Sequence, residues 1–117
     1  MSTTLVAEIT SSASPQEGQK HRSSNNFAIP YVPEGTTSFT FKVIPSGSDN
    51  ANSILFNVES DNPSGKDPII WGGSDKESMV KNNYITSQYI KTFTDTLYIA
   101  DPEGATSGFN VQIWANK

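Results

Sequence analysis

The 117-residue chain contains no cysteine, which excludes disulfide bridges, thiolate metal sites and cysteine nucleophiles. It has a single histidine, His21, in a polar stretch without an apolar residue to hold the imidazole in place. Metal sites built on two or three histidines are therefore excluded, and a Ser-His-Asp arrangement lacks a fixed base. There is also no glycine-rich phosphate-binding loop. We expect no catalytic residue, no metal, no cofactor and no enzymatic activity.

Positive charge and long apolar runs are also scarce. Eight Lys and Arg residues stand against twelve Asp and Glu residues, which gives a net charge of −4, and only Lys20 to Arg22 form a basic cluster. Binding to nucleic acid or to an anionic membrane surface is therefore disfavoured. No apolar run reaches the roughly 18 residues that a membrane span needs, and the first residues do not resemble a signal peptide. The expected location is the cytoplasm, or the exterior by an unconventional secretion route.

What the chain does contain is Ser, Thr, Asn and Gly between short runs of alternating apolar residues, a pattern typical of strands and turns. In 38–44, for example, Phe39, Phe41 and Val43 alternate with polar residues. The sequence predicts an all-β fold, with residues 1–117 as one antiparallel β-sandwich of about seven strands, immunoglobulin- or fibronectin-like. The candidate strands are 5–10, 38–44, 54–59, 68–71, 84–91, 96–100 and 108–114, while 27–32 predicts an edge strand or an extended loop because of Pro30 and Pro33.

Several segments are less uniform. Residues 5–10 fit either a strand or a short amphipathic helix, because Leu5 and Ile9 lie four residues apart. Residues 11–26 have almost no apolar content and predict a long loop or a mobile arm. Residues 76–81 predict a helical turn, capped by the preceding Ser74-Asp75. Residues 96–100 and 108–114 are expected to pair as the last hairpin.

The segment 108–114, GFNVQIW, is the most informative for function. Phe109, Val111 and Ile113 form an ordinary core face, while Asn110, Gln112 and Trp114 share the opposite, polar face. An indole ring flanked by amide side chains suits a sugar ring, because it offers stacking together with hydrogen bonds that replace water. Trp114 equally suits the cover of a sheet edge, a place beneath the arm, or a dimer interface, where Trp is enriched.

Three other positions extend this hypothesis. Asp101 and Asp95 are candidate acceptors for sugar hydroxyl groups. Tyr98 fits two interpretations: it shares the polar face of Trp114 across the hairpin, or it forms a tyrosine corner whose hydroxyl bonds back to the backbone. Trp71 follows Ile69-Ile70 and precedes two glycines, which indicates a place in the core or at its rim.

An ordered set of short motifs resembles the fungal immunomodulatory proteins, which are small lectin-like proteins. The set covers most of the chain except 11–24 and 64–90. It comprises the Met-Ser-Thr-Thr-Leu-Val opening, Asn25-Asn26-Phe27, the aromatic-Thr-aromatic-basic-Val strand 39–43 with Ser46-Gly47, Val58 to Asp61, Asp95-Thr96, Asp101-Pro102 and the final strand ending at Trp114. The family's Trp-Gly-Arg stretch before Asn-Asn-Phe is missing, since His21 to Ser24 occupy that place.

This resemblance implies a fibronectin-like sandwich, dimerisation through the N-terminal segment, and glycan binding or haemagglutination. It places Trp114, Asp95 and Thr96 near the sugar site. We therefore expect a lectin-like homodimer that binds glycans or glycoproteins through Trp114, Asn110, Gln112, Tyr98, Asp95, Thr96 and Asp101. The alternative is an immunoglobulin-like protein-protein interaction or assembly module without sugar binding.

Overall fold

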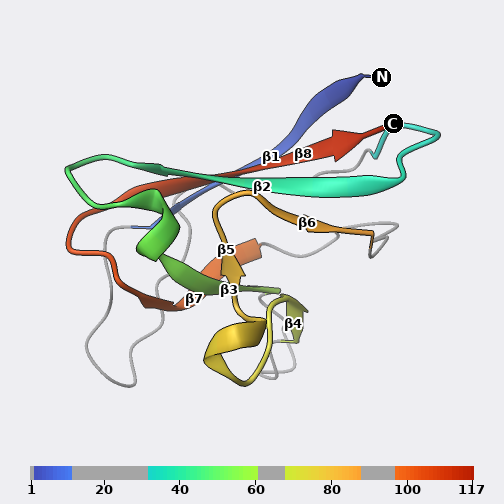
Figure 1. The fold of residues 1–117 in the computed structure, drawn as a ribbon. Coiled ribbons are helices and arrows are strands. Elements are labelled where there is room, and N and C mark those ends of the chain that lie inside the picture. The colour runs from blue at the N-terminus through green and yellow to red at the C-terminus, as the bar shows by residue number, and fades with distance from the viewer. Residues whose placement is uncertain (1, 12–31, 61–67, 88–96) are drawn as a thin grey trace.

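The computed structural model describes residues 2–11, 32–60, 68–87 and 97–117, and these form two antiparallel β-sheets packed face to face (Figure 1). The predicted all-β sandwich is therefore confirmed. The first sheet has the strand order β1 (Thr3–Ser11), β8 (Phe109–Asn116), β2 (Ser38–Pro45), β6 (Tyr84–Thr86). The second is built around β3 (Leu55–Ser60), which pairs with β7 (Leu97–Glu103), β4 (Ile69–Trp71) and β5 (Val80–Lys81).

Three strand pairs of the described chain are nested along the sequence. β1 pairs with β8, β2 with β6, and β3 with β5, always antiparallel. The pair β3–β7 of the second sheet breaks this nesting, because β7 follows β6 in the sequence. The described strands depart from the constant-type immunoglobulin pattern, in which the first and last strands belong to different sheets, since β1 and β8 are paired in the first sheet.

Two short 3-10 turns complete the described elements: η1 (Ala51–Ser53) and η2 (Lys76–Ser78). The side chain of Asp75 caps η2 by accepting the backbone N–H of Ser78 at 2.9 Å. The helical turn expected over 76–81 is thus present only to Ser78, because Val80 and Lys81 pair with β3. No helix among the described residues is long and apolar enough to cross a membrane.

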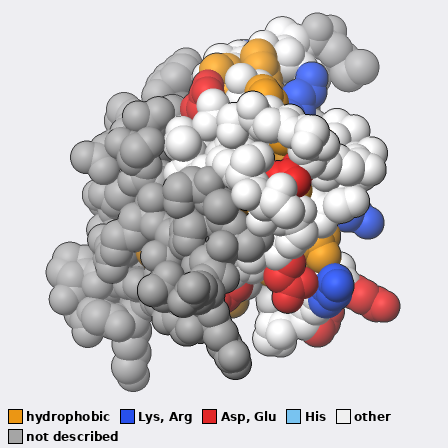
Figure 2. All heavy atoms as spheres, turned by 90° about the vertical axis from the view of Figure 1, so that its left-hand side faces the viewer, with side chains coloured by type: hydrophobic (Ala, Val, Ile, Leu, Met, Phe, Trp, Pro, Cys, Tyr) orange, Lys and Arg blue, Asp and Glu red, His pale blue; other side chains and the backbone are white. Residues whose placement is uncertain are grey.

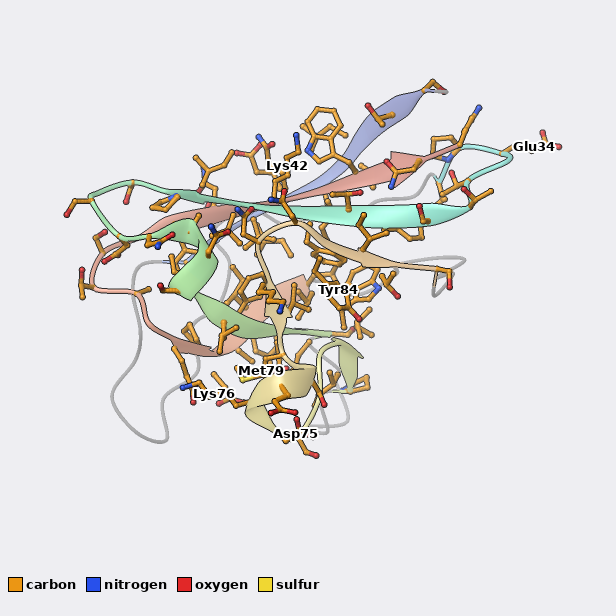
Figure 3. The ribbon with its side chains drawn as sticks, viewed as in Figure 1. Glu34, Lys42, Asp75, Lys76, Met79 and Tyr84 are labelled. Atoms are coloured by element: carbon orange, nitrogen blue, oxygen red, sulfur yellow. The ribbon has the colours of Figure 1, made fainter. Side chains whose placement is uncertain are left out.

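Aromatic side chains fill the space between the sheets. Trp71 is 1% exposed and meets Phe41 edge to face, with ring centroids 4.9 Å apart, while Phe39 lies at 6.1 Å. Tyr84 also contacts Phe41, with ring centroids 5.8 Å apart, and lies between the sheets (Figure 3). The prediction that Trp71 belongs to the core or its rim is confirmed, and it belongs to the core.

The strand alternative for residues 5–10 is confirmed, but its predicted alternation is wrong at one end. Leu5 pairs with Trp114 and Ala7 with Ile113, so Val6 is an extra residue in a β-bulge. A shift of one residue exchanges the two faces of a strand. Val6 is therefore buried, and Leu5 is 41% exposed on the other side.

The predicted hairpin of 96–100 with 108–114 is wrong. β7 pairs with β3 in the second sheet, whereas β8 lies between β1 and β2 in the first. The connection 104–108 therefore crosses from one sheet to the other, starting at Gly104, whose φ of +80° is in the left-handed region. The expected arm or loop at 11–26, apart from Ser11 in β1, lies outside the described residues, as does 27–31.

Asp49 fastens this crossing to the turn after β2. Its carboxylate accepts the backbone N–H groups of Thr106 at 2.9 Å and Ser107 at 3.0 Å, and it also accepts both of their hydroxyls. These hydrogen bonds, led by the Thr106 hydroxyl, lower the pKa of Asp49 from 3.8 to about 2.

We expect Asp49→Asn to weaken the pH dependence of the free energy of unfolding between pH 3.8 and about pH 2. The pKa of Asp49 is lower in the folded state, so the unfolded chain takes up the proton first as the pH falls. The stabilisation is complete above the unfolded value of 3.8 and is lost as the pH falls through about 2. Asparagine does not titrate, and its amide nitrogen cannot replace the carboxylate oxygen that accepts the Thr106 hydroxyl. Urea denaturation of both proteins from about pH 6 to about pH 2 measures the difference, and equal slopes would contradict the role of Asp49.

Candidate functional site

The face of the first sheet that points away from the second sheet carries the predicted polar surface. β8 lies in its centre with β1 and β2 on either side, and directly opposed residues share one face. We call this surface the outer face; it consists of four rows across β1, β8 and β2, namely Thr3–Asn116–Ser38, Leu5–Trp114–Thr40, Glu8–Gln112–Lys42 and Thr10–Asn110–Ile44. The predicted alternation of 108–114 is confirmed, because Phe109, Val111 and Ile113 are buried in the core.

Trp114 is half-buried in the middle of the outer face. Its indole Nε1 donates a hydrogen bond to Oε1 of Gln112 at 3.2 Å, which fixes the orientation of the ring along β8. The Lys42 ammonium lies over the ring, 5.8 Å from its centroid. Lys42 points away from the second sheet (Figure 3). The ring, the amide and the ammonium thus form one group on the surface.

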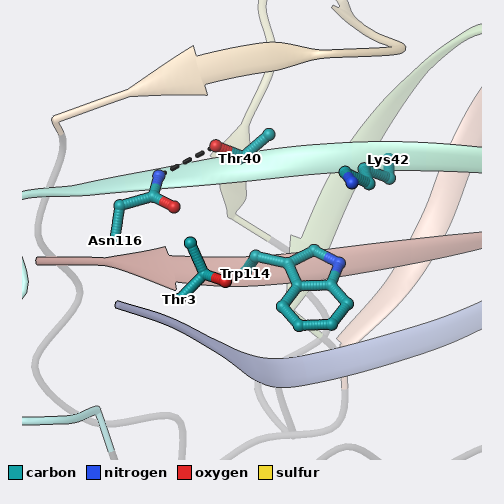
Figure 4. Close-up of a pocket in the computed structure, with 5 residues that line it drawn as sticks. All are labelled: Thr3, Thr40, Lys42, Trp114 and Asn116. Carbon is teal, nitrogen blue, oxygen red and sulfur yellow. Dashed lines mark hydrogen bonds between the residues drawn. The ribbon is translucent and has the colours of Figure 1, made fainter. Parts of the chain in front are cut away.

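A shallow hollow of about 180 Å³ lies beside this group (Figure 4). Its lining combines the indole with hydroxyl, amide and ammonium groups: Thr3, Thr40, Lys42, Trp114 and Asn116. A second hollow, of about 350 Å³, shares three of these residues, so the two hollows adjoin on the outer face, and we call them together the groove. The second hollow is lined by Ser2, Thr3, Thr37, Ser38, Thr40, Ile85, Asn116 and Lys117.

Hydrogen bonds hold the polar lining in place. The Nδ2 group of Asn116 donates to the hydroxyls of Thr40 at 2.8 Å and Ser38 at 3.1 Å (Figure 4 draws the first). Asn110 donates to the carboxylate of Glu8 at 3.2 Å, one row beyond Gln112. The Asn116 amide oxygen receives no hydrogen bond from a described side chain, so it can accept one from a ligand.

The structure brings together three of the predicted site residues, Trp114, Gln112 and Asn110, on the outer face. Tyr98 is elsewhere: it is fully buried in β7, on the second sheet, and its hydroxyl donates to Glu59 at 2.9 Å. The shared-face interpretation of Tyr98 is therefore wrong, because it depended on a hairpin that does not form. The tyrosine-corner interpretation requires a backbone acceptor, whereas this hydrogen bond is made to a carboxylate.

Asp101 is also far from Trp114. It belongs to β7 and is exposed with φ at +51°, at the position where β7 has one residue more than β3. The two sheets of a sandwich lie about 10 Å apart, and Trp114 is on the far side of the first sheet. Asp95 and Thr96 lie outside the described residues.

Four lining residues, Thr3, Thr40, Lys42 and Asn116, were not among the predicted site residues. A signal for three of them was available. Asn116 continues the alternation of Asn110, Gln112 and Trp114, and Thr40 and Lys42 were expected to face outwards. Knowing that they meet required knowing that β2 is the neighbour of β8, which no local pattern reveals.

On the end of the molecule seen in Figure 2, the described surface is mostly uncharged polar and backbone atoms, with hydrophobic side chains only in small groups. Within the described ranges, no three His, Cys, Asp or Glu side chains come together as a metal site.

Comparisons with protein-family models, with curated proteins and with solved structures find no match to this chain.

Proposed function

We propose that the protein is a non-catalytic carbohydrate-binding protein whose site is the hollow beside Trp114. The observation that carries the proposal is a half-buried tryptophan on a polar sheet face, next to a hollow lined by hydroxyl, amide and ammonium groups. An indole ring stacks on the C–H face of a sugar, and the surrounding groups exchange hydrogen bonds with its hydroxyls. In this role Trp114 stacks, while Asn116, Thr40 and Thr3 form the hydrogen bonds.

The affinity expected of one such site is low. The hollow is open and few groups converge on it, so a dissociation constant between about 1 mM and about 1 μM is expected for one sugar unit. A homodimer with two sites would crosslink glycoproteins on cells, as a haemagglutinin does. The resemblance to fungal immunomodulatory proteins supports a lectin-like dimer of this kind, and we include it in the proposal.

The test is a glycan-array screen of the wild type and Trp114→Ala. We expect the wild type to bind a coherent class of glycans and the variant to lose about fivefold or more in affinity, taking as the scale the stacking of a nucleobase on an aromatic side chain, which is worth about 1–3 kcal/mol. The melting temperature and far-UV circular dichroism of the variant should remain close to those of the wild type. Leu5→Ala, at the neighbouring position of the same row, is the matched control and should still bind.

Either of two results would refute this function. The first is that no glycan is bound by the wild type. The second is that Leu5→Ala and Trp114→Ala reduce binding equally, because the loss would then reflect the strand pairing and not the indole.

One observation favours a second candidate, a protein-protein interaction module. Leu5, 41% exposed, is directly opposite Trp114, and Ile44, 44% exposed, lies on the same face. Trp is enriched among interface hot spots, and neighbouring apolar side chains such as these would exclude water around it. Analytical ultracentrifugation separates the two functions: loss of the dimer in Trp114→Ala together with Leu5→Ala would assign the outer face to a protein interface.

A further inference from the structure

Within the groove of the outer face, positive charge is present without a described acidic partner. The lining residues of the two hollows include Lys42 and Lys117 but no Asp or Glu. Lys42 is exposed and forms no ion pair with a described residue, in contrast to Lys76, whose ammonium is 3.8 Å from Glu103 on the second sheet. In a chain with a net charge of −4, this is a local exception.

Among the described rows of the outer face, Glu8 is the one acidic side chain. On the outer face, Glu8 is in the same row as Lys42 but two strands away, with Gln112 between them. The Glu8 carboxylate accepts a hydrogen bond from Asn110, on the side away from the hollow. Neighbouring strands lie about 4.8 Å apart, so the two backbones are separated by roughly 10 Å, where water and salt screen the attraction.

Lys42 also lies close to the Trp114 ring, on which a sugar would stack. Its ammonium lies over the Trp114 ring at 5.8 Å from the centroid, and the same two side chains line the hollow. A sugar in contact with the indole would carry its ring substituents within reach of this ammonium. A carboxylate or sulfate substituent would form a charge-assisted hydrogen bond there, which is stronger than a bond to a neutral hydroxyl.

The groove is longer than one sugar. The first hollow, about 180 Å³, adjoins the second, about 350 Å³, at Thr3, Thr40 and Asn116, and the lining of the second is rich in hydroxyl groups. Uncharged hydroxyl and amide groups suit the following units of a chain, because each can donate to or accept from sugar hydroxyls.

Resting on the carbohydrate-binding function proposed above, we propose that the ligand is an acidic oligosaccharide, with an anionic group on Lys42, a ring on Trp114 and further units along the second hollow. The anionic group is a carboxylate or a sulfate, and the two sources are separate arms of the test.

The experiment measures binding by titration calorimetry to three probes: oligogalacturonate, its methyl ester, which is the same chain without charge, and a sulfated galactan oligosaccharide, which carries sulfates but no carboxylates. We expect at least one anionic probe to bind up to about fivefold more tightly than the methyl ester at low salt, since an exposed ion pair is worth at most about 1 kcal/mol. The preference should disappear as the salt concentration rises from about 0.01 M to about 1 M.

Lys42→Gln should lower binding of the anionic probe to the level of the methyl ester, whereas Lys42→Arg should preserve the preference for the anionic probe. The matched control is Lys81→Gln, an exposed lysine on β5 of the second sheet, which changes the net charge by the same amount. A preference for the anionic probe that Lys81→Gln reduces as much as Lys42→Gln would overturn the inference, since it would reflect overall charge.

The outcomes also separate the two proposals. Equal binding of anionic and neutral chains that Trp114→Ala abolishes refutes the acidic ligand but supports carbohydrate binding. No binding of any probe, together with a negative glycan array, refutes both. Tighter binding of only the sulfated or only the carboxylated probe identifies which anionic group Lys42 takes.

Discussion

Trp71→Ala is expected to lower the free energy of unfolding by about 3–5 kcal/mol, the range for removing a fully buried large aromatic side chain. Trp71 is 1% exposed, and its ring packs against Phe41 at 4.9 Å and Phe39 at 6.1 Å, so its loss leaves a cavity between the sheets. Small domains have a total stability of about 5–15 kcal/mol. The loss is therefore a large fraction of the total stability.

Urea denaturation measures this loss, and Trp114→Ala is the matched comparison, because it removes the same side chain from the outer face. Trp114 is half-buried and lies on a surface, so its removal creates no internal cavity and costs much less. Trp71→Phe keeps an aromatic ring in the core and should fall between the two. Equal losses for Trp71→Ala and Trp114→Ala would contradict the assignment of the two tryptophans to core and surface.

Gly104→Ala is the second substitution with a large expected effect. Gly104 has φ at +80°, and a β-carbon built there would lie 2.1 Å from the backbone oxygen of Ser53. Backbone strain at a positive φ costs about 1–3 kcal/mol. Moving two backbone segments apart adds about 1–3 kcal/mol, as for other overpacked sites.

Gly35→Ala separates these two contributions. Gly35 has a similar φ of +87°, but its nearest neighbour to an added β-carbon is the flexible Lys117 side chain at 4.0 Å. It should therefore show only the strain, while Gly104→Ala shows strain and overlap together. If urea denaturation gives the same loss in the free energy of unfolding for both variants, the close approach of Gly104 to Ser53 does not contribute to the effect of Gly104→Ala.

Sequence reasoning correctly predicted the features that depend on the residues of a single strand. In β2 and β8, apolar residues at alternate positions identify the buried face, because one side of each strand meets the core and the other meets solvent. The outward direction of Trp114, Gln112 and Lys42 follows from that alternation alone. The end of β4 is also a local feature, because the strand is followed by Gly72, whose φ of +133° few other residues adopt.

The parts that were missed depend on which strands are neighbours. Nothing in residues 97–103 states that β7 pairs with β3 and not with the following strand β8, so Tyr98 and Asp101 were placed beside Trp114. The bulge at Val6 is equally invisible, since Leu5, Ala7 and Ile9 alternate well on paper. Glu59 and Tyr98 are a further example. They are opposite each other on β3 and β7, and both are buried, although polar side chains in a strand usually indicate its solvent face.

β1 and β8, the first and last strands of the described chain, pair like the two strands of a hairpin, although no turn joins them. Thr3 pairs with Asn116, and the backbone N–H of Lys117 donates to the oxygen of Ser2 at 3.1 Å, so the two ends lie side by side (Figure 1). This contact has the greatest sequence separation in the first sheet, and such contacts slow folding. A short linker from 117 to 2, with new ends opened in another loop, would make it the most local contact in the sheet. The same rearrangement would free the rim of the groove from chain ends, so that a fused tag no longer stands beside the hollow.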